Sequence, residues 1–231
     1  MMFQKKFHAV MRLDRFRYAV LALLTAPSLA SAASCDDHSL SWSKTPKAGT
    51  VKADQGPRLH FQRVEDGCPG GDTCTAKAYL VPGDTVVLDD TGEAWICAYF
   101  QGPKRGTFGW LPRTALEIDN KPPAPKKQDW VGRWRVGENT VLIDDRNREN
   151  LRFKGWARHM ATFSLSDFEF FTLPKGNKVV DKSAGGECVV TIRWVATLLL
   201  VNSTQYCVGA ANSFDGVYRR TALTTDPKDE H

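Results

Sequence analysis

The sequence lacks the residue patterns that most often support catalysis or metal binding. No serine lies in a G-x-S-x-G pattern, no Cys-x-x-Cys pair occurs, and the 231 residues include only five histidines. A nucleophilic serine or cysteine needs a base beside it, and zinc sites usually combine closely spaced Cys and His ligands. We therefore predict that the protein is not an enzyme, and that it holds no metal and no cofactor.

The chain also lacks an apolar run long enough to cross a membrane. The run Tyr18–Ala26 is only about half of the ~20 residues that a spanning helix needs. It follows five basic residues and leads into Ala30-Ser31-Ala32, an order that is typical of a secretory signal. We expect cleavage near Ala32, no integral membrane span, and a periplasmic or secreted protein. Lipid attachment at Cys35 is an alternative.

Little net charge remains outside the predicted leader. The whole sequence has 31 Lys or Arg and 26 Asp or Glu, and residues 1–32 hold five of the basic residues and one Asp. The rest of the chain therefore carries 26 basic and 25 acidic residues. Nucleic-acid binding usually goes with a marked basic excess. We therefore predict no nucleic-acid partner.

Six cysteines follow the predicted leader. They are Cys35, Cys68, Cys74, Cys97, Cys188 and Cys207. An even number of cysteines in an exported chain is typical of a disulfide framework. The five residues between Cys68 and Cys74 are rich in turn formers, which favours a local bond. We expect Cys188 to pair with Cys207, because they lie on strand-like segments joined by a hairpin. This leaves Cys35 for Cys97.

A spacer divides the chain into two β-rich halves. Residues 121–128 contain three prolines and three lysines without a hydrophobic period, which is typical of a semi-rigid linker. Each half is large enough for one small core. We predict an all-β chain with a signal peptide over 1–32, a first domain over 35–118, a linker over 119–128, a second domain over 129–222 and a polar tail over 223–231.

The first half is a series of short β-capable segments. We expect strands at Arg58–Val64, Thr85–Leu88, Ala94–Phe100 and Thr107–Leu111, and a short turn at Ala115–Glu117. Pro, Gly and Asp lie between them and favour turns. Compact strands at this spacing predict a small barrel.

Four elements in this half resemble a bacterial SH3-like (SH3b) domain over about residues 76–118. They are Val86-Val87-Leu88, Trp95-Ile96-Cys97, Gly109-Trp110-Leu111-Pro112 and Leu116. In that family an exposed aromatic groove takes extended peptides or cell-wall peptide stems. The resemblance places Trp95 and Pro112 in such a groove, with Trp110 as a further candidate ligand-binding residue. The alternative is that either tryptophan belongs to the core of so small a barrel.

The second half opens with Trp130-Val-Gly-Arg-Trp134 and continues as short strands. We expect them at Thr140–Ile143, Asn150–Phe153, Asp167–Phe171, Lys178–Val180, Glu187–Trp194, Thr197–Val201 and Gly216–Tyr218. Turn residues such as Asp144-Asp145 and Lys175-Gly176-Asn177 separate several of them. This order predicts an antiparallel up-and-down barrel.

The ends of this second half resemble the closure of a lipocalin-like barrel. Gly132-x-Trp134 lies at its start, and Arg219 and Arg220 follow its last expected strand. In that family the tryptophan packs across the barrel end and a late arginine lies over its ring, an arrangement that a cation–π contact stabilises. The stretch Cys207–Arg220 also resembles the end of uncharacterised bacterial exported domains, which implies no activity.

Two acidic groups have alternatives to a purely structural role. The segment Asp144-Asp145-Arg-Asn147-Arg-Glu149 has oxygen-bearing side chains at alternate positions, as calcium sites do. It lacks the Gly and the distant bidentate Glu of an EF-hand loop, so we favour a charged hairpin turn. Asp167 and Glu169 share one face of an expected strand. Glycoside hydrolysis would need such a pair in a cleft, whereas the phenylalanines around them favour a rim or core position.

Three functions remain compatible with the sequence. We favour an exported, non-enzymatic binding protein of the bacterial cell envelope, whose SH3-like half engages a peptide, a cell-wall component or an envelope protein. The first alternative is an inhibitor or immunity protein against a cell-wall-degrading enzyme or toxin. The second is a carrier that holds a small apolar ligand in the second barrel, which would require a sizeable apolar cavity.

Overall fold

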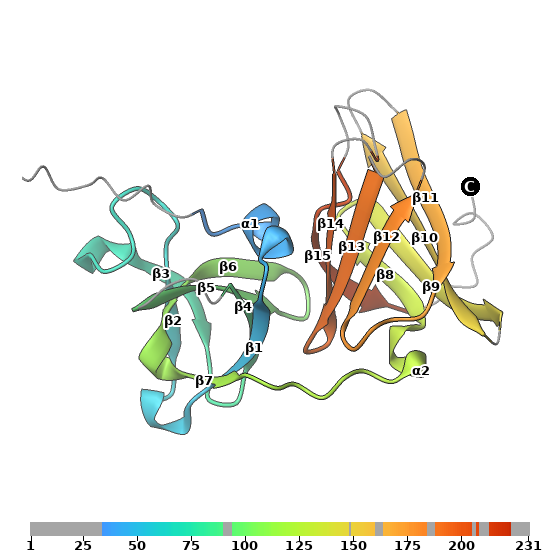
Figure 1. Ribbon diagram of the computed structural model, residues 1–231. Coiled ribbons are helices and arrows are strands. Elements are labelled where there is room, and N and C mark those ends of the chain that lie inside the picture. The colour runs from blue at the N-terminus through green and yellow to red at the C-terminus, as the bar shows by residue number, and fades with distance from the viewer. Residues whose placement is uncertain are drawn as a thin grey trace, which may run out of the picture. The chain divides into compact units, whose positions relative to one another are not determined.

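Strands make up nearly all of the regular structure. The computed structural model describes residues 34–89, 94–147, 149–159, 164–183, 188–204, 207 and 213–222, which belong to one compact unit (Figure 1). The predicted signal peptide and polar tail lie outside these residues. Two short helices, α1 (Asp37–Trp42) and α2 (Lys127–Trp130), accompany two antiparallel sheets. The prediction of an all-β chain is confirmed.

Seven strands form the first sheet, in the order β3-β2-β6-β5-β4-β1-β7. They are β1 (Pro46–Val51), β2 (Leu59–Gln62), β3 (Thr75–Leu80), β4 (Thr85–Asp89), β5 (Trp95–Gln101), β6 (Gly106–Pro112) and β7 (Leu116–Asp119). One side of the sheet encloses a core around Phe61, Ile96 and Ala98. Because side chains alternate along a strand, Cys97 and Tyr99 of β5 face the other side.

Three strands of this sheet, β1, β3 and β7, are not among those expected from the sequence. β1 contains Pro46 and Gly49, residues that weaken a strand pattern, yet it pairs with both β4 and β7. A Cβ added at Gly49 would lie 2.6 Å from Leu88 Cδ1, so the missing side chain lets β1 approach its neighbour. The second is the edge strand β3. The third, β7, includes Leu116 and Glu117, so the turn expected at Ala115–Glu117 is misplaced: a 3-10 turn over Arg113–Ala115 precedes the strand.

Eight strands form the second sheet, in the order β11-β10-β9-β8-β15-β14-β13-β12. They are β8 (Gly132–Val136), β9 (Asn139–Asn147), β10 (Asn150–His159), β11 (Ser164–Thr172), β12 (Lys178–Ser183), β13 (Cys188–Val195), β14 (Leu198–Ser203) and β15 (Gly216–Thr221). The first and last of them, β8 and β15, pair with each other, and β11 and β12 lie at the ends of the sheet. The result is a nearly closed antiparallel barrel, as predicted.

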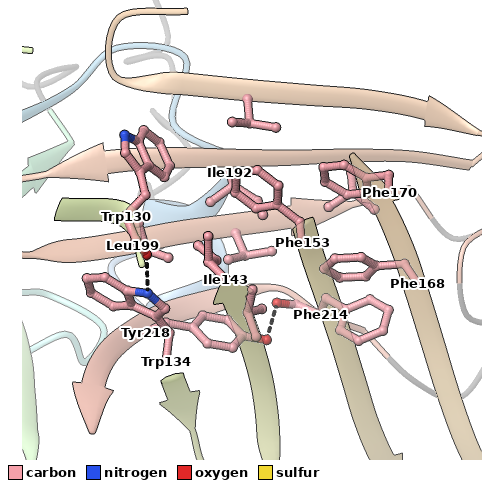
Figure 2. Packing of buried hydrophobic residues seen from close by; sticks show 14 of the residues in the cluster. Trp130, Trp134, Ile143, Phe153, Phe168, Phe170, Ile192, Leu199, Phe214 and Tyr218 are labelled. Carbon is pink, nitrogen blue, oxygen red and sulfur yellow. Dashed lines mark hydrogen bonds between the residues drawn. The ribbon is translucent and has the colours of Figure 1, made fainter. Parts of the chain in front are cut away.

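Aromatic side chains line the inside of this barrel and contact one another across it (Figure 2). Phe153 stacks on Phe170 with ring centroids 5.2 Å apart, and Phe168 meets Phe214 edge-on at 4.7 Å. The hydroxyl of the buried Tyr218 donates a hydrogen bond of 2.8 Å to the Phe214 carbonyl. Burial raises the pKa of this phenol, because its ionised form would lose hydration.

A tryptophan and an arginine close one end of the barrel. The indole Nε1 of Trp134 donates a hydrogen bond of 3.0 Å to the carbonyl of Trp130, the last residue of α2 (Figure 2). The guanidinium carbon of Arg220 lies 4.7 Å from the centroid of the Trp134 ring, and Arg220 also donates to the Asp129 carbonyl. The predicted contact of a late arginine with Trp134 is therefore present, and Arg220 makes it.

One turn in the barrel was placed wrongly from the sequence. Asp144 and Asp145 lie within β9, which runs on to Asn147, and not in a hairpin turn. Asp144 is opposite Arg152 of β10, which donates a 2.6 Å hydrogen bond to it. A charge-paired carboxylate is compatible with a strand, whereas an isolated Asp-Asp pair favours a turn. The turn expected at Lys175-Gly176-Asn177 is confirmed.

All three predicted disulfides are present. They join Cys35 to Cys97, Cys68 to Cys74 and Cys188 to Cys207. The first bond fastens the segment before α1 to β5, and a capping box between Asp36 and Ser39 begins that helix. Since structural disulfides persist in oxidising compartments, the three bonds indicate a protein that functions outside the cytoplasm.

Candidate binding surface

The predicted binding residues lie on the outer face of the β5–β6 hairpin. Three cross-strand pairs follow one another on this face, and they are Trp95 with Pro112, Cys97 with Trp110, and Tyr99 with Phe108. Paired residues in neighbouring strands have Cβ atoms about 4.5–5.5 Å apart and point to the same side. The fold therefore brings all three predicted residues onto one surface.

Two of these pairs pack against other parts of the protein, with Cys97 and Tyr99 buried and Phe108 and Trp110 half-buried. Trp110 and Phe108 pack against an apolar cluster whose buried members are Cys35, Leu40, Val87, Cys97, Tyr99, Val195, Leu198, Leu200 and Val217. Leu40 belongs to α1, and the last four belong to strands β13, β14 and β15. β14 is accordingly buried on both faces, with Leu199 inside the barrel and Leu200 in this cluster.

Polar contacts hold α1 on the barrel strands beside this cluster. The side-chain amide of Asn202 donates a hydrogen bond of 2.7 Å to the Ser41 carbonyl. The carboxylate of Asp215 accepts from the indole N–H of Trp42 and lies 3.3 Å from Nδ1 of His38. A helix of six residues would be marginal alone, and these contacts stabilise it. They place α1 against β14 and β15, where Leu40 joins the apolar cluster that also contains Cys97 and Tyr99 of β5.

The Trp95–Pro112 pair remains partly open. Both residues are half-buried, and neither belongs to an apolar cluster of the described residues. The loop closed by the Cys68–Cys74 disulfide lies alongside, since a Cβ added at Gly70 would be 3.8 Å from the indole nitrogen of Trp95. The pair and the backbone of this loop form a shallow surface. The cysteine spacing predicted the loop but not its position beside Trp95.

The other sequence candidates are in separate places. Asp167 and Glu169 are exposed on β11, where they alternate with the buried Phe168 and Phe170. Glu169 lies 3.7 Å from Arg152. Within the described ranges no group of three or more His, Cys, Asp or Glu residues is arranged to hold a metal ion. No described helix is long and apolar enough to cross a membrane.

Comparison with known proteins finds no matching family model, no curated relative and no solved structure of similar fold. The SH3-like and lipocalin-like resemblances therefore stay predictions, carried by the residues that suggested them. What the surface can do follows from its own chemistry. An indole and a pyrrolidine ring beside each other offer a flat apolar platform, and the glycine-rich loop next to them adds backbone hydrogen-bonding groups.

Proposed function

We propose that this chain is an exported, non-enzymatic binding protein of the bacterial cell envelope, periplasmic or secreted. Its SH3-like half engages an extended peptide or a cell-wall peptide stem on the surface formed by Trp95 and Pro112. One observation carries the proposal: these two residues are cross-strand partners at the end of the β5–β6 face that the apolar cluster leaves uncovered.

The chemistry of the two side chains supports an extended ligand. Aromatic and proline surfaces bind chains that are already extended, because little conformational entropy is lost on binding. The Trp95 indole also keeps an N–H donor near the Cys68–Cys74 loop, which suits a peptide carbonyl. A partly exposed tryptophan is the residue type that most often dominates a binding energy.

Binding of the Trp95→Ala variant tests the proposal. The chain without its leader is titrated with a proline-rich nonapeptide, and in parallel is co-sedimented with purified cell-wall sacculi. We expect Trp95→Ala to weaken binding to at least one of these probes about tenfold or more, because a groove tryptophan commonly contributes over 1.4 kcal/mol.

The matched control is Tyr79→Ala, which removes a 43% exposed aromatic residue from the edge strand β3 of the same sheet. It should bind as the wild type does. Equal binding of Trp95→Ala and wild type to every probe that binds would remove this surface as the functional site.

A further inference from the structure

A pocket lies where the tip of the β5–β6 hairpin meets strands β8 and β15. Its volume is about 420 Å³, and its polar lining includes Gln101, Lys104, Arg105, Arg135, Arg219 and Thr221. Small-molecule sites typically enclose about 300–1,000 Å³. The sequence predicts none of these residues as a ligand-binding residue, because they lie in three segments that only the folded chain brings together.

The lining is strongly basic. Lys104, Arg105, Arg135 and Arg219 all line the pocket, and no lining residue is acidic. Among the residues that the structure describes, none of these four cations has a carboxylate oxygen within 4.0 Å. Like charges in a concave site reinforce one another and raise the local concentration of counter-ions. The pocket therefore favours an anion.

Two of the arginines, Arg135 and Arg219, face each other across neighbouring strands, which is unfavourable in a sheet. Arg135 of β8 and Arg219 of β15 are direct cross-strand partners. Their neighbours Trp134 and Tyr218 face the barrel core, so both arginines lie on the outer face toward the pocket. Like charges directly opposite each other destabilise a strand pair. An anion bound between them would offset this repulsion.

The hairpin that supplies the other two cations is held in one conformation. The Tyr99 ring lies so close over Gly106 that a Cβ added there would be 2.2 Å from it. The Tyr99 hydroxyl donates to Oε1 of Gln101, and Nε2 of Gln101 donates to the Gly102 carbonyl at 2.6 Å. Gly102 N–H in turn donates to the Arg105 carbonyl at 3.1 Å. Contacts within the hairpin thus organise the loop that carries Lys104 and Arg105.

We propose that this pocket binds a small ligand that bears a phosphate group. Guanidinium groups donate two parallel hydrogen bonds to phosphate oxygens, and a lysine adds a compact positive charge. A phosphate monoester carries a charge of about −1.5 to −2 near pH 7, which matches four cations better than a single carboxylate does. This site is separate from Trp95 and does not depend on the function proposed above.

Titration calorimetry on the leaderless chain tests the site with three phosphate probes: pyrophosphate, glycerol 3-phosphate, and vesicles that contain phosphatidic acid. We expect binding that weakens as salt is added. The double variant Arg135→Gln/Arg219→Gln should weaken it at least about tenfold, since a charge-assisted hydrogen bond commonly contributes more than 1.4 kcal/mol. Binding of the two soluble probes identifies a free phosphorylated compound as the source, and binding of the vesicles alone identifies a lipid headgroup.

The control is Lys178→Gln/Lys182→Gln, which removes the same charge from exposed positions on β12 outside the pocket. It should bind the probes as the wild type does, and Trp95→Ala should too. Without ligand, the double arginine variant should melt no lower than the wild type, because it removes a like-charge pair. Four outcomes would overturn the proposal. The arginine and lysine variants could lose binding equally, or the arginine variant could bind as the wild type does. The protein could also bind acetate more tightly than pyrophosphate, or bind no phosphate probe at all.

Discussion

The two sheets place their aromatic residues on opposite sides. In the barrel of β8–β15 most of the large rings face inward, as the fully buried Trp134, Phe153 and Tyr218 do, whereas Phe171 is exposed. The inner core of the first sheet is mostly aliphatic, and Trp95 and Trp110 lie on its outer face. Inward rings stabilise the domain that holds them. Outward rings mark where a sheet contacts another part of the protein or a partner. At Trp110 the contact is with the apolar cluster that α1 and the barrel strands contribute to.

The largest expected effect comes from the inward set. Trp134→Ala should lower the free energy of unfolding by about 3–5 kcal/mol, because it leaves a cavity and removes both the hydrogen bond to Trp130 and the contact with Arg220. Urea denaturation measures it. The control Phe171→Ala, at a side chain 53% exposed on β11, should change the value by less than about 1 kcal/mol. A smaller loss for Trp134 than for Phe171 would contradict the contrast between inward and outward rings.

The stability that each disulfide contributes should increase with the length of chain that it encloses. Their sequence separations are 62 for Cys35–Cys97, 19 for Cys188–Cys207 and 6 for Cys68–Cys74. In the chain-entropy model, replacing each pair with alanines should cost about 4, 3 and 2 kcal/mol respectively.

Denaturation of the three double variants measures this order, and peptide mapping without reductant checks the remaining bonds in each. The Cys35–Cys97 bond also fastens the covered face of the first sheet to the segment before α1. If its removal cost least of the three, α1 would not contribute to the stability of that face.

The sequence predicted the fold better than the surface. Most barrel strands follow alternating apolar residues, and the Cys68–Cys74 and Cys188–Cys207 bonds follow from local segments of the chain. The Cys35–Cys97 bond joins distant residues and is predicted only by elimination. The strand β3, Thr-Ala-Lys-Ala-Tyr-Leu, has a weak strand pattern and lies at the edge of the sheet, where it pairs with β2. The apolar cluster against which Trp110 packs contains Leu40 and Leu200, which are about 160 positions apart in the sequence, and no local pattern reports such a cluster.

A smaller effect should follow from the contacts of α1. Asn202→Ala removes the hydrogen bond to the Ser41 carbonyl and leaves a buried acceptor without that partner, which should cost about 1–2 kcal/mol. Compared with the wild type, the variant should show faster hydrogen exchange of the α1 amides, and a smaller change in the barrel strands. Asn120→Ala, at an exposed position, serves as the control. Unchanged protection of α1 would mean that the apolar cluster alone holds the helix in place.

The smallest loss of stability should come from Trp95, and its neighbour Trp110 provides the comparison. Both rings lie on the outer face of the same hairpin, one residue pair apart, but only Trp110 packs against the apolar cluster. Trp110→Ala should therefore cost about 3 kcal/mol, as the loss of a packed tryptophan does. Trp95→Ala should cost about 1 kcal/mol or less, because Trp95 packs against no apolar cluster of the described residues and little internal cavity forms. Thermal and urea unfolding of the two variants, beside peptide and sacculus binding, separate the roles.

If Trp95→Ala destabilised the protein as much as Trp110→Ala, Trp95 would be a core residue and any loss of binding would be secondary to unfolding. A stable Trp95→Ala protein with weakened binding is the outcome that assigns the ring to a ligand.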